Sequence, residues 1–253
     1  MKTQQIKKKR GSRIITIICL LIFIYSAYRL IEIGYDYYRN HQVLTDIQEV
    51  YSPIERQEQS EENQQQRSSF NPLLDINEDI VAWITVEGTK IDYPILQSTD
   101  NDYYLNRNYL HQETRAGSIF MDFRNDITLE EEHTIVYGHR MKDGSMFAGL
   151  NQYLEPEFYQ EHPSFSFDTL YQSYEVEIFA AYVTTTDFYY IETDFQEEQQ
   201  FDVLLQEMKK RSAITTDVEV GSKDRIITLS TCDYQLDREL GRLVVHGKLT
   251  SRN

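Results

Sequence analysis

The sequence predicts a mainly β domain of the α+β class: a closed β-barrel of about seven to eight strands with inserted helices, preceded by an N-terminal helical stalk. Short β-branched and aromatic runs separated by turn residues dominate the chain after residue 70. Hydrophobic residues make up 40% of the 253 positions and aromatic residues 13%, a composition typical of a folded protein and not of a disordered one. Apolar residues at helical spacing are confined to a few segments, so helices interrupt the strands and do not replace them.

Strands are expected where β-branched and aromatic residues follow one another, because these side chains fit a pleated, half-buried surface. Such runs occupy Ile80–Val86, Ile91–Leu96, Ser118–Phe123, Thr134–Tyr137, Tyr174–Thr184, Arg225–Leu229 and Arg242–Leu249. Helices are expected at Pro72–Asp79, Asn101–Arg107, Ser145–Tyr153, Glu155–Glu161 and Gln196–Arg211. The last helix carries apolar residues on one face: Phe201, Leu204, Leu205 and Met208.

The first 33 residues have the pattern of a membrane anchor. A basic tail at residues 1–13 contains six lysines and arginines and no acid, and residues 14–33 form an apolar stretch. Because about 20 apolar residues cross a bilayer, we expect a single-pass transmembrane signal anchor at 14–33. The basic tail is expected in the cytoplasm and residues 34–253 outside the cell. A cleaved signal peptide is the alternative, since its apolar stretch is similar in length.

A stalk and spacer are expected between the anchor and the folded domain. Residues 34–52 have helical spacing and predict a stalk helix, whereas residues 56–69 contain no large apolar residue and predict a polar spacer. The folded domain is expected at residues 70–253. The whole chain has a formal charge of −16 and the basic tail has +6, so the remainder carries −22. Such an acidic body repels phosphate backbones, and nucleic acid is therefore not an expected partner.

The cysteine count points to a reactive thiol. The chain has two cysteines, and Cys19 lies inside the apolar stretch, so Cys232 has no partner for a disulfide in the exported part. An exported protein seldom keeps an unpaired thiol without a use, because it invites oxidation and cross-linking. Cys232 ends the run R-I-I-T-L-S-T-C, which leaves a predicted strand, and Arg242 opens the next strand, so a hairpin connection brings the two close together. The structural alternative is a small buried cysteine and an ordinary surface arginine.

A catalytic thiol needs an acid–base partner, which one of the six histidines must supply. His139 is the best placed, because it follows the strand run T-I-V-Y-G and lies at a strand end. Composition alone does not separate it from a structural histidine.

Three segments resemble a known family. The runs T-L-S-T-C at 228–232, G-R-L-V-V-H-G-K-L at 241–249 and Y-G-H at 137–139 are similar to those of the sortases, and more closely to the class B sortases of Gram-positive bacteria. The segments N-D-Y-Y-L-N at 101–106 and T-T-D-F-Y-Y-I at 185–191 also resemble class B. The similarity covers roughly residues 70–250 and implies a sortase-like barrel as the catalytic domain.

The resemblance implies a membrane-anchored cysteine transpeptidase. Such an enzyme cleaves an NPxTN-like sorting signal of an exported protein after Thr and transfers the protein to a peptidoglycan-precursor amine. By the same resemblance Cys232 is the nucleophile that forms a thioester, His139 carries the proton and Arg242 stabilises the acyl centre. The resemblance also implies a peptide groove lined by Asn101, Leu105, Thr186, Tyr190, Ile191 and Ser230. No cofactor and no metal ion are expected.

Two alternatives remain open at this stage. The first is a class B-type pilus polymerase that joins pilins through a lysine amine. The second is a non-catalytic surface adhesin or assembly scaffold on the same barrel, since an acidic, tyrosine-rich face suits protein binding. A binding module has no need for Cys232, His139 and Arg242 together, which favours the enzyme.

Overall fold

The computed structural model describes residues 2–51 and 66–252 and divides into two compact units, Met1–Val43 and Leu44–Asn253. Helix α1 (Lys2–Val50) is continuous and supplies the first unit. Its segment Arg13–Val50 is long and apolar enough to cross a membrane by length and composition, with a mean hydropathy of 2.3 in its apolar window. The predicted stalk helix is part of α1. Residues 56–65 of the predicted spacer lie outside the described residues.

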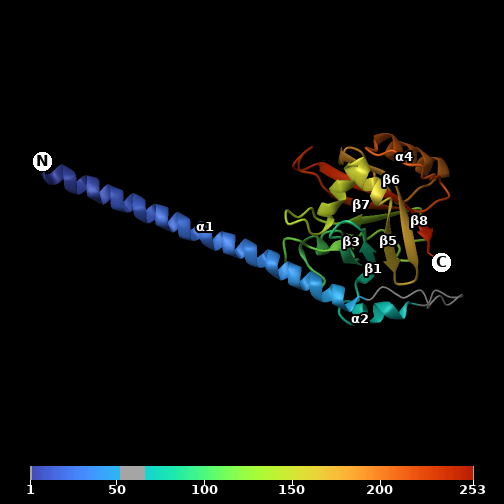
Figure 1. Ribbon diagram of the computed structural model, residues 1–253, viewed down its shortest axis with the longest axis horizontal. Helices are drawn as coiled ribbons and strands as arrows, with labels where there is room; N and C mark the ends of the chain where they lie inside the picture. Colours follow the sequence, from blue (N-terminus) through green and yellow to red (C-terminus); the bar gives the residue numbers. More distant parts are fainter. Residues whose placement is uncertain (1, 52–65, 253) are drawn as a thin grey trace. The chain divides into compact units, whose positions relative to one another are not determined.

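The second unit is a closed eight-stranded barrel with the strand order β1-β2-β3-β4-β7-β8-β6-β5, which confirms the predicted fold class (Figure 1). The pairs β2–β3 and β4–β7 are parallel and the other pairs are antiparallel. The strands are β1 Ile80–Thr85, β2 Asp92–Leu96, β3 Ile119–Met121, β4 His133–Tyr137, β5 Ser164–Thr169, β6 Ser173–Thr185, β7 Ile226–Cys232 and β8 Gly241–Ser251.

The strand predictions differ from the structure in two informative ways. Strand β5 was not predicted, because its sequence S-F-S-F-D-T contains serine and aspartate, which are uncommon in strands. It forms nevertheless, since Phe165 and Phe167 alternate into the barrel interior. Strand β7 extends beyond its predicted end at Leu229, so Cys232 is the last residue of a strand.

The helices are shorter than predicted. The segment predicted as Pro72–Asp79 is helical only in α2 (Asn71–Leu74), because the side chain of Asn77 accepts the Asp79 N–H at 2.8 Å and closes a turn. The other inserted helices are η1 (Ser68–Phe70), η2 (Tyr103–Asn106), η3 (Phe147–Leu154), α3 (Pro156–Glu161) and α4 (Glu198–Arg211). Those named η are 3₁₀ helices.

Among the described residues, apolar side chains form two layers of the barrel. One fills its interior and includes Ala82 and Ile84 of β1, which have no exposed surface. The other lies outside the barrel wall, where α4 packs on β6 and covers its residues Phe179, Ala180 and Tyr182. The predicted apolar face of α4 makes this contact.

The outer face of β4, β7 and β8 carries the residues that matter for function. Side chains alternate across a strand, so residues two apart share a face. In β7, Leu229 belongs to the interior layer, which places Thr228, Ser230 and Cys232 on the outer face. Parallel pairing sets Tyr137 of β4 opposite Ser230. One wall of the barrel therefore presents a column of polar groups that ends at Cys232.

Candidate active site

Cys232 and Arg242 form the last residue pair between β7 and β8. They are directly opposite each other in the antiparallel register, so both side chains leave the sheet on one face. The pair is closed by a hydrogen bond from the Asp233 N–H to the Gly241 carbonyl at 2.9 Å. A Cβ atom on Gly241 would lie 2.0 Å from the Asp233 carbonyl oxygen, so only glycine permits this close turn immediately before Arg242.

His139 lies at the same end of the sheet. Strand β4 runs parallel to β7, and the Gly138 N–H donates to the Ser230 carbonyl at 3.2 Å, so the chain after β4 emerges beside Cys232. His139 Nε2 lies 2.7 Å from the Leu105 carbonyl oxygen. A carbonyl only accepts, so Nε2 carries the proton and Nδ1 is the basic nitrogen of the neutral ring.

Arg242 is half-buried, and its Nη1 donates to the carbonyl oxygens of Glu239 at 3.0 Å and Gly241 at 2.8 Å. These bonds fix the guanidinium beside the loop that joins β7 to β8. An arginine has about five N–H donors, so further donors remain for a charge that develops near Cys232. The chemistry open to this arrangement is attack by a thiol with an imidazole for proton transfer and a guanidinium for the oxyanion.

Two of the predicted groove residues, Tyr190 and Ser230, meet next to this pair. The Tyr190 hydroxyl lies 2.8 Å from Ser230 Oγ, and only 4% of Tyr190 is exposed. Burial raises the pKa of Tyr190, the bond to Ser230 and the charge of Arg242 lower it, and Cys232 raises it. Arg242 and Cys232 both act on the Tyr190 phenol because its ring lies close to them.

The other predicted groove residues are tied to the same region by their main chains. The Thr186 N–H donates to the Leu240 carbonyl at 3.1 Å, which joins the β6–β7 connection to the β7–β8 loop. The Leu105 carbonyl binds His139, and the Ile191 carbonyl accepts a bond from Arg124 Nη2 at 3.0 Å. Leu105 and Ile191 are half-buried and Thr186 is exposed.

Asn101, the last predicted groove residue, is fixed at both ends of its amide. Its Nδ2 donates to Asp122 Oδ2 at 3.1 Å, and its Oδ1 accepts the Phe123 N–H at 3.0 Å. An amide nitrogen has two N–H groups, so one remains beyond the bond to Asp122.

Asp122 and Arg124 were not singled out from the sequence, yet they organise one side of the site. Asp122 is fully buried and accepts two side-chain bonds of 2.8 Å from Arg124 and one of 2.9 Å from the Tyr137 hydroxyl. Burial alone would raise the pKa of Asp122, but the bonds from Arg124 and Tyr137 lower it. Arg124 also donates to the Tyr189 hydroxyl at 3.2 Å and so connects the β3–β4 turn to the β6–β7 connection.

Asp233, Arg140 and Tyr234 were also missed. Asp233 is 4% exposed, accepts a 2.7 Å bond from Arg140, and binds the N–H groups of residues 235 and 236 at 2.9 and 2.8 Å. This holds the start of the β7–β8 loop against the segment after His139. Tyr234 is half-exposed and lies close to the Cys232 side chain; partial burial and Cys232 raise the pKa of Tyr234. The sequence signal that could have revealed Asp233 is its position as a carboxylate directly after the candidate nucleophile.

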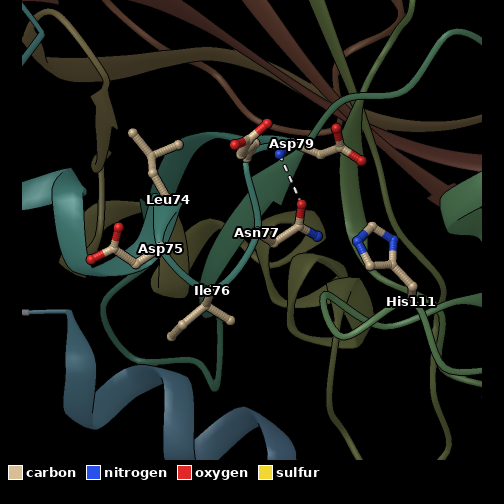
Figure 2. A pocket seen from close by; sticks show the side chains of 7 residues that line it. Leu74, Asp75, Ile76, Asn77, Asp79 and His111 are labelled. Carbon is tan, nitrogen blue, oxygen red and sulfur yellow. Dashed lines mark hydrogen bonds between the residues drawn. The ribbon is translucent and has the colours of Figure 1, made fainter.

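Two shallow hollows lie on the surface of the second unit. One, of about 450 Å³, is lined by residues 74–79 and His111 (Figure 2), and none of the predicted site residues lines it. Asn77 stands at its centre and is used structurally, through the bond to the Asp79 N–H. The other hollow, of about 520 Å³, is lined by residues 234–240 of the β7–β8 loop, directly between Cys232 and Arg242 in the chain.

Comparison with known proteins decides the family. The family described as "Sortase domain" matches residues 84–250, which include every candidate catalytic and groove residue. The chain belongs to the sortase family. Sortase B of Listeria monocytogenes is 47% identical over 238 residues, covering 94% of this chain and 96% of the relative. This sortase is therefore of class B and is a cysteine transpeptidase.

Solved structures agree with this assignment. Sortase B from Bacillus anthracis, in complex with AAEK1, has a TM-score of 0.77 and 47% identity, and the match covers 87% of this chain and all of that chain. A sortase B–substrate complex from Staphylococcus aureus has a TM-score of 0.78 and 39% identity, with coverage of 85% and 98%. The predicted family and fold class are thus both confirmed.

Proposed function

We propose that this sortase is anchored in the cell membrane and cleaves an NPxTN-like sorting signal after Thr, with Cys232 as nucleophile, and transfers the exported protein to a peptidoglycan-precursor amine. The observation that carries the proposal is the pairing of Cys232 with Arg242 at the strand end where His139 follows the parallel strand β4. Three groups of different chemistry, from three neighbouring strands, then serve one bound carbonyl.

The first half of the reaction forms the acyl-enzyme. The Cys232 sulfur attacks the threonine carbonyl, and its proton passes to His139. The oxyanion accepts hydrogen bonds from Arg242, whose charge is permanent and whose N–H groups are not all used by the loop. The carbon–nitrogen bond then breaks as His139 protonates the leaving amine, which leaves a thioester on Cys232.

The second half runs the same steps in reverse. An incoming amine attacks the thioester carbonyl and gives a proton to Nδ1 of His139, and the new amide forms as the Cys232 thiol is regenerated. Nδ1 is the nitrogen available for both transfers, because Nε2–H is held by the Leu105 carbonyl at 2.7 Å. That bond also keeps the ring from turning between the two steps.

The peptide groove in this proposal is lined by six residues from three segments: Asn101, Leu105, Thr186, Tyr190, Ile191 and Ser230. The free N–H of Asn101 and the Tyr190–Ser230 pair supply polar contacts, while Leu105 and Ile191 supply apolar surface. Support for substrate binding comes from the Staphylococcus aureus relative, whose structure was solved as a sortase B–substrate complex. Half-burial of Leu105 and Ile191 is what a partly open groove requires.

The acceptor amine is proposed to approach over the β7–β8 loop. The hollow lined by residues 234–240 follows Cys232 closely in the chain, and Tyr234, Leu236 and Leu240 are 53%, 55% and 44% exposed. The remaining part of the proposal is the topology: a basic cytoplasmic tail at 1–13, a single-pass anchor at 14–33, a stalk and spacer at 34–69, and an extracellular catalytic domain at 70–253.

The proposal is tested with the purified full chain in detergent micelles. A quenched fluorescent peptide containing an NPxTN signal is incubated with an amine from each class: a peptidoglycan stem peptide with a free amine, and a pilin domain with an exposed lysine. Cleavage between Thr and Asn, with transfer to the stem peptide, supports the proposal. Transfer to the pilin lysine alone contradicts the assigned acceptor, and cleavage elsewhere in the peptide contradicts the assigned signal.

A further inference from the structure

Two fully buried histidines form a hydrogen-bonded chain on the wall that carries Cys232. His133 Nδ1 lies 2.7 Å from the Glu192 carbonyl oxygen, and His133 Nε2 lies 2.6 Å from Thr228 Oγ1. The same Thr228 oxygen lies 2.7 Å from His246 Nδ1, and His246 Nε2 lies 2.9 Å from the Tyr182 hydroxyl. The chain thus joins strands β4, β7, β8 and β6 and ends on the β6–β7 connection.

The position of each proton in this hydrogen-bonded chain follows from the Glu192 carbonyl at one end of it. The Glu192 carbonyl only accepts, so His133 Nδ1 carries a proton. In a neutral ring Nε2 then accepts, and the Thr228 hydroxyl must donate to it. Thr228 therefore accepts from His246 Nδ1–H, and His246 Nε2 accepts from the Tyr182 hydroxyl. Every donor points toward Glu192, and no group in the chain is left without a partner.

Both imidazoles are held neutral by their surroundings. His133 and His246 have no exposed surface, and burial lowers the pKa of His133 to about 4 and that of His246 well below its usual value. The charges of Arg124 and Asp122 act on His133 in opposite directions. A neutral His133 has a single N–H donor, which is committed to Glu192.

This chain lies on the same face as the reactive thiol. Thr228 and His246 are opposite each other in the β7–β8 register, and Cys232 and Arg242 are opposite each other four residues further along. At about 3.3 Å per residue, the histidines lie about 13 Å from the thiol and do not take part in its chemistry. Their effect is carried by the segment they hold.

That segment contains the proposed peptide-binding residues. Glu192 directly follows Tyr190 and Ile191 in the chain, and both of these residues pack on the apolar layer under α4. Three hydrogen bonds from side chains outside the stretch hold it in addition. Arg124 holds the Ile191 carbonyl at 3.0 Å, Ser230 holds the Tyr190 hydroxyl at 2.8 Å, and His133 holds the Glu192 carbonyl. No strand is assigned at residues 186–195, so no sheet hydrogen bonds fix this part of the described chain.

We propose that His133 is a positioning residue for substrate recognition: through its Nδ1–H it holds the Glu192 main chain, and with it Tyr190 and Ile191, in the conformation that receives the sorting peptide. The buried partners Thr228, His246 and Tyr182 fix the orientation and tautomer of His133. This inference rests on the proposed peptide groove. It predicts an effect on peptide binding and not on the reaction of the thiol.

The test compares two substitutions that mimic different nitrogens of the ring. His133→Asn keeps an N–H donor near the position of Nδ1, whereas His133→Gln places its amide near Nε2 and loses the bond to Glu192. Ile178→Val is the matched control, because it removes a buried methyl group from the barrel interior and touches none of these residues. Each full chain is measured in detergent micelles for KM and kcat with the quenched NPxTN peptide.

We expect His133→Gln to raise KM for the peptide by roughly tenfold, the factor that one lost hydrogen bond of ordinary strength gives, with kcat within about threefold. His133→Asn should keep KM within about threefold, and the rate of alkylation of Cys232 by iodoacetamide should be unchanged in both. If His133→Gln does not fold, Thr228→Val replaces it, since it removes the hydroxyl that orients the ring at nearly constant shape, and the same rise in KM is expected.

Several results would overturn the inference. These are an unchanged KM in the variants that lose the bond, a loss confined to kcat, equal impairment of His133→Asn and His133→Gln, or an equal rise in KM for Ile178→Val at the same loss of stability. Tyr190→Phe and Ile191→Ala separate this inference from the proposed groove. If these two substitutions leave KM unchanged, the groove itself is wrong; if they raise KM while His133→Gln does not, only the role of His133 is wrong.

Discussion

Acid should destabilise the folded protein through His133, and the size of the effect follows from its burial. The pKa of His133 is lowered to about 4 by burial, whereas the unfolded chain has an ordinary histidine pKa near about 6.5. Between these values the unfolded chain binds a proton that the folded protein does not, so the free energy of unfolding falls as the pH falls. Above about pH 6.5 His133 costs the folded protein nothing, because the histidine is neutral in both states. Below that pH the free energy of unfolding falls progressively toward pH 4.

The expected magnitude is about 3 kcal/mol, since each pKa unit corresponds to about 1.4 kcal/mol. The perturbation that isolates it is His133→Gln, which does not titrate. Carboxylates such as Asp122, whose pKa is lowered, also lose stabilisation in acid, but they do so equally in both proteins. The difference in the free energy of unfolding between the native protein and His133→Gln should therefore shrink by about 3 kcal/mol from pH 7 to pH 4.

Urea unfolding of the full chain in non-ionic detergent micelles measures this difference. Trp83 is the single tryptophan and is fully buried, where it stacks on Tyr51 with ring centroids 4.1 Å apart, so its fluorescence reports the folding of the second unit. Ile178→Val provides the comparison, because a buried substitution that does not titrate should lower stability by the same amount at every pH. A difference between native protein and His133→Gln that stays constant within about 0.5 kcal/mol from pH 7 to pH 4 would refute the reasoning.

Three further predictions concern the site itself. Gly241→Ala should lower kcat/KM at least about 100-fold in the peptide-cleavage assay. The added Cβ would meet the Asp233 carbonyl oxygen at 2.0 Å and displace the β7–β8 loop. Activity within about threefold of the native protein would contradict the close turn. Arg242→Ala should lower kcat by roughly 10²–10³, and Arg242→Lys should recover less than about tenfold of that loss in the same assay, since lysine lacks the planar fork; full recovery by lysine would show that charge alone suffices. Asp122→Asn should reduce the free energy of unfolding by about 3 kcal/mol and raise KM, because it leaves Arg124 without its buried charged partner. Urea unfolding measures the first effect and peptide kinetics the second. An unchanged KM would show that the Asp122–Arg124 ion pair does not support the groove.

The sequence was sufficient for the barrel because its strands are marked locally. Six of the predicted strands coincide closely with observed ones, and β7 differs only in its length. β-branched runs mark where a strand lies and turn residues mark where it ends, so neither requires knowledge of the neighbouring strands. Strand β5 escaped because Ser164, Ser166 and Asp168 have low strand propensity, and only pairing with β1 and β6 makes this segment a strand.

Cys232 could be inferred as the candidate nucleophile from the number and positions of the cysteines alone. Two cysteines, one of them inside the apolar stretch, leave Cys232 unpaired wherever the chain folds. Choosing His139 among six histidines was different, because its position depends on the parallel register of β4 against β7, which no local pattern encodes. The family motif supplied that choice.

The supporting networks were not predicted, for the same physical reason. Asp122 and Arg124 lie in a turn after β3, yet they act on residues 189 and 191, some 65 positions later in the chain. His133 and His246 lie more than 100 positions apart in the sequence, although Thr228 joins them at 2.6 and 2.7 Å. Contacts of this kind depend on strand order, and they are where the structure adds most to the sequence.

The most direct test of the mechanism is mass spectrometry of the trapped acyl-enzyme. The full chain in micelles is incubated with an NPxTN peptide without an acceptor amine, quenched in acid and digested. The account predicts that the peptide fragment ending in Thr is attached to the sulfur of Cys232, and that Cys232→Ala forms no adduct while retaining the Trp83 fluorescence of the folded barrel. An adduct on any other residue, or acylation that survives in Cys232→Ala, would contradict the assignment of the nucleophile.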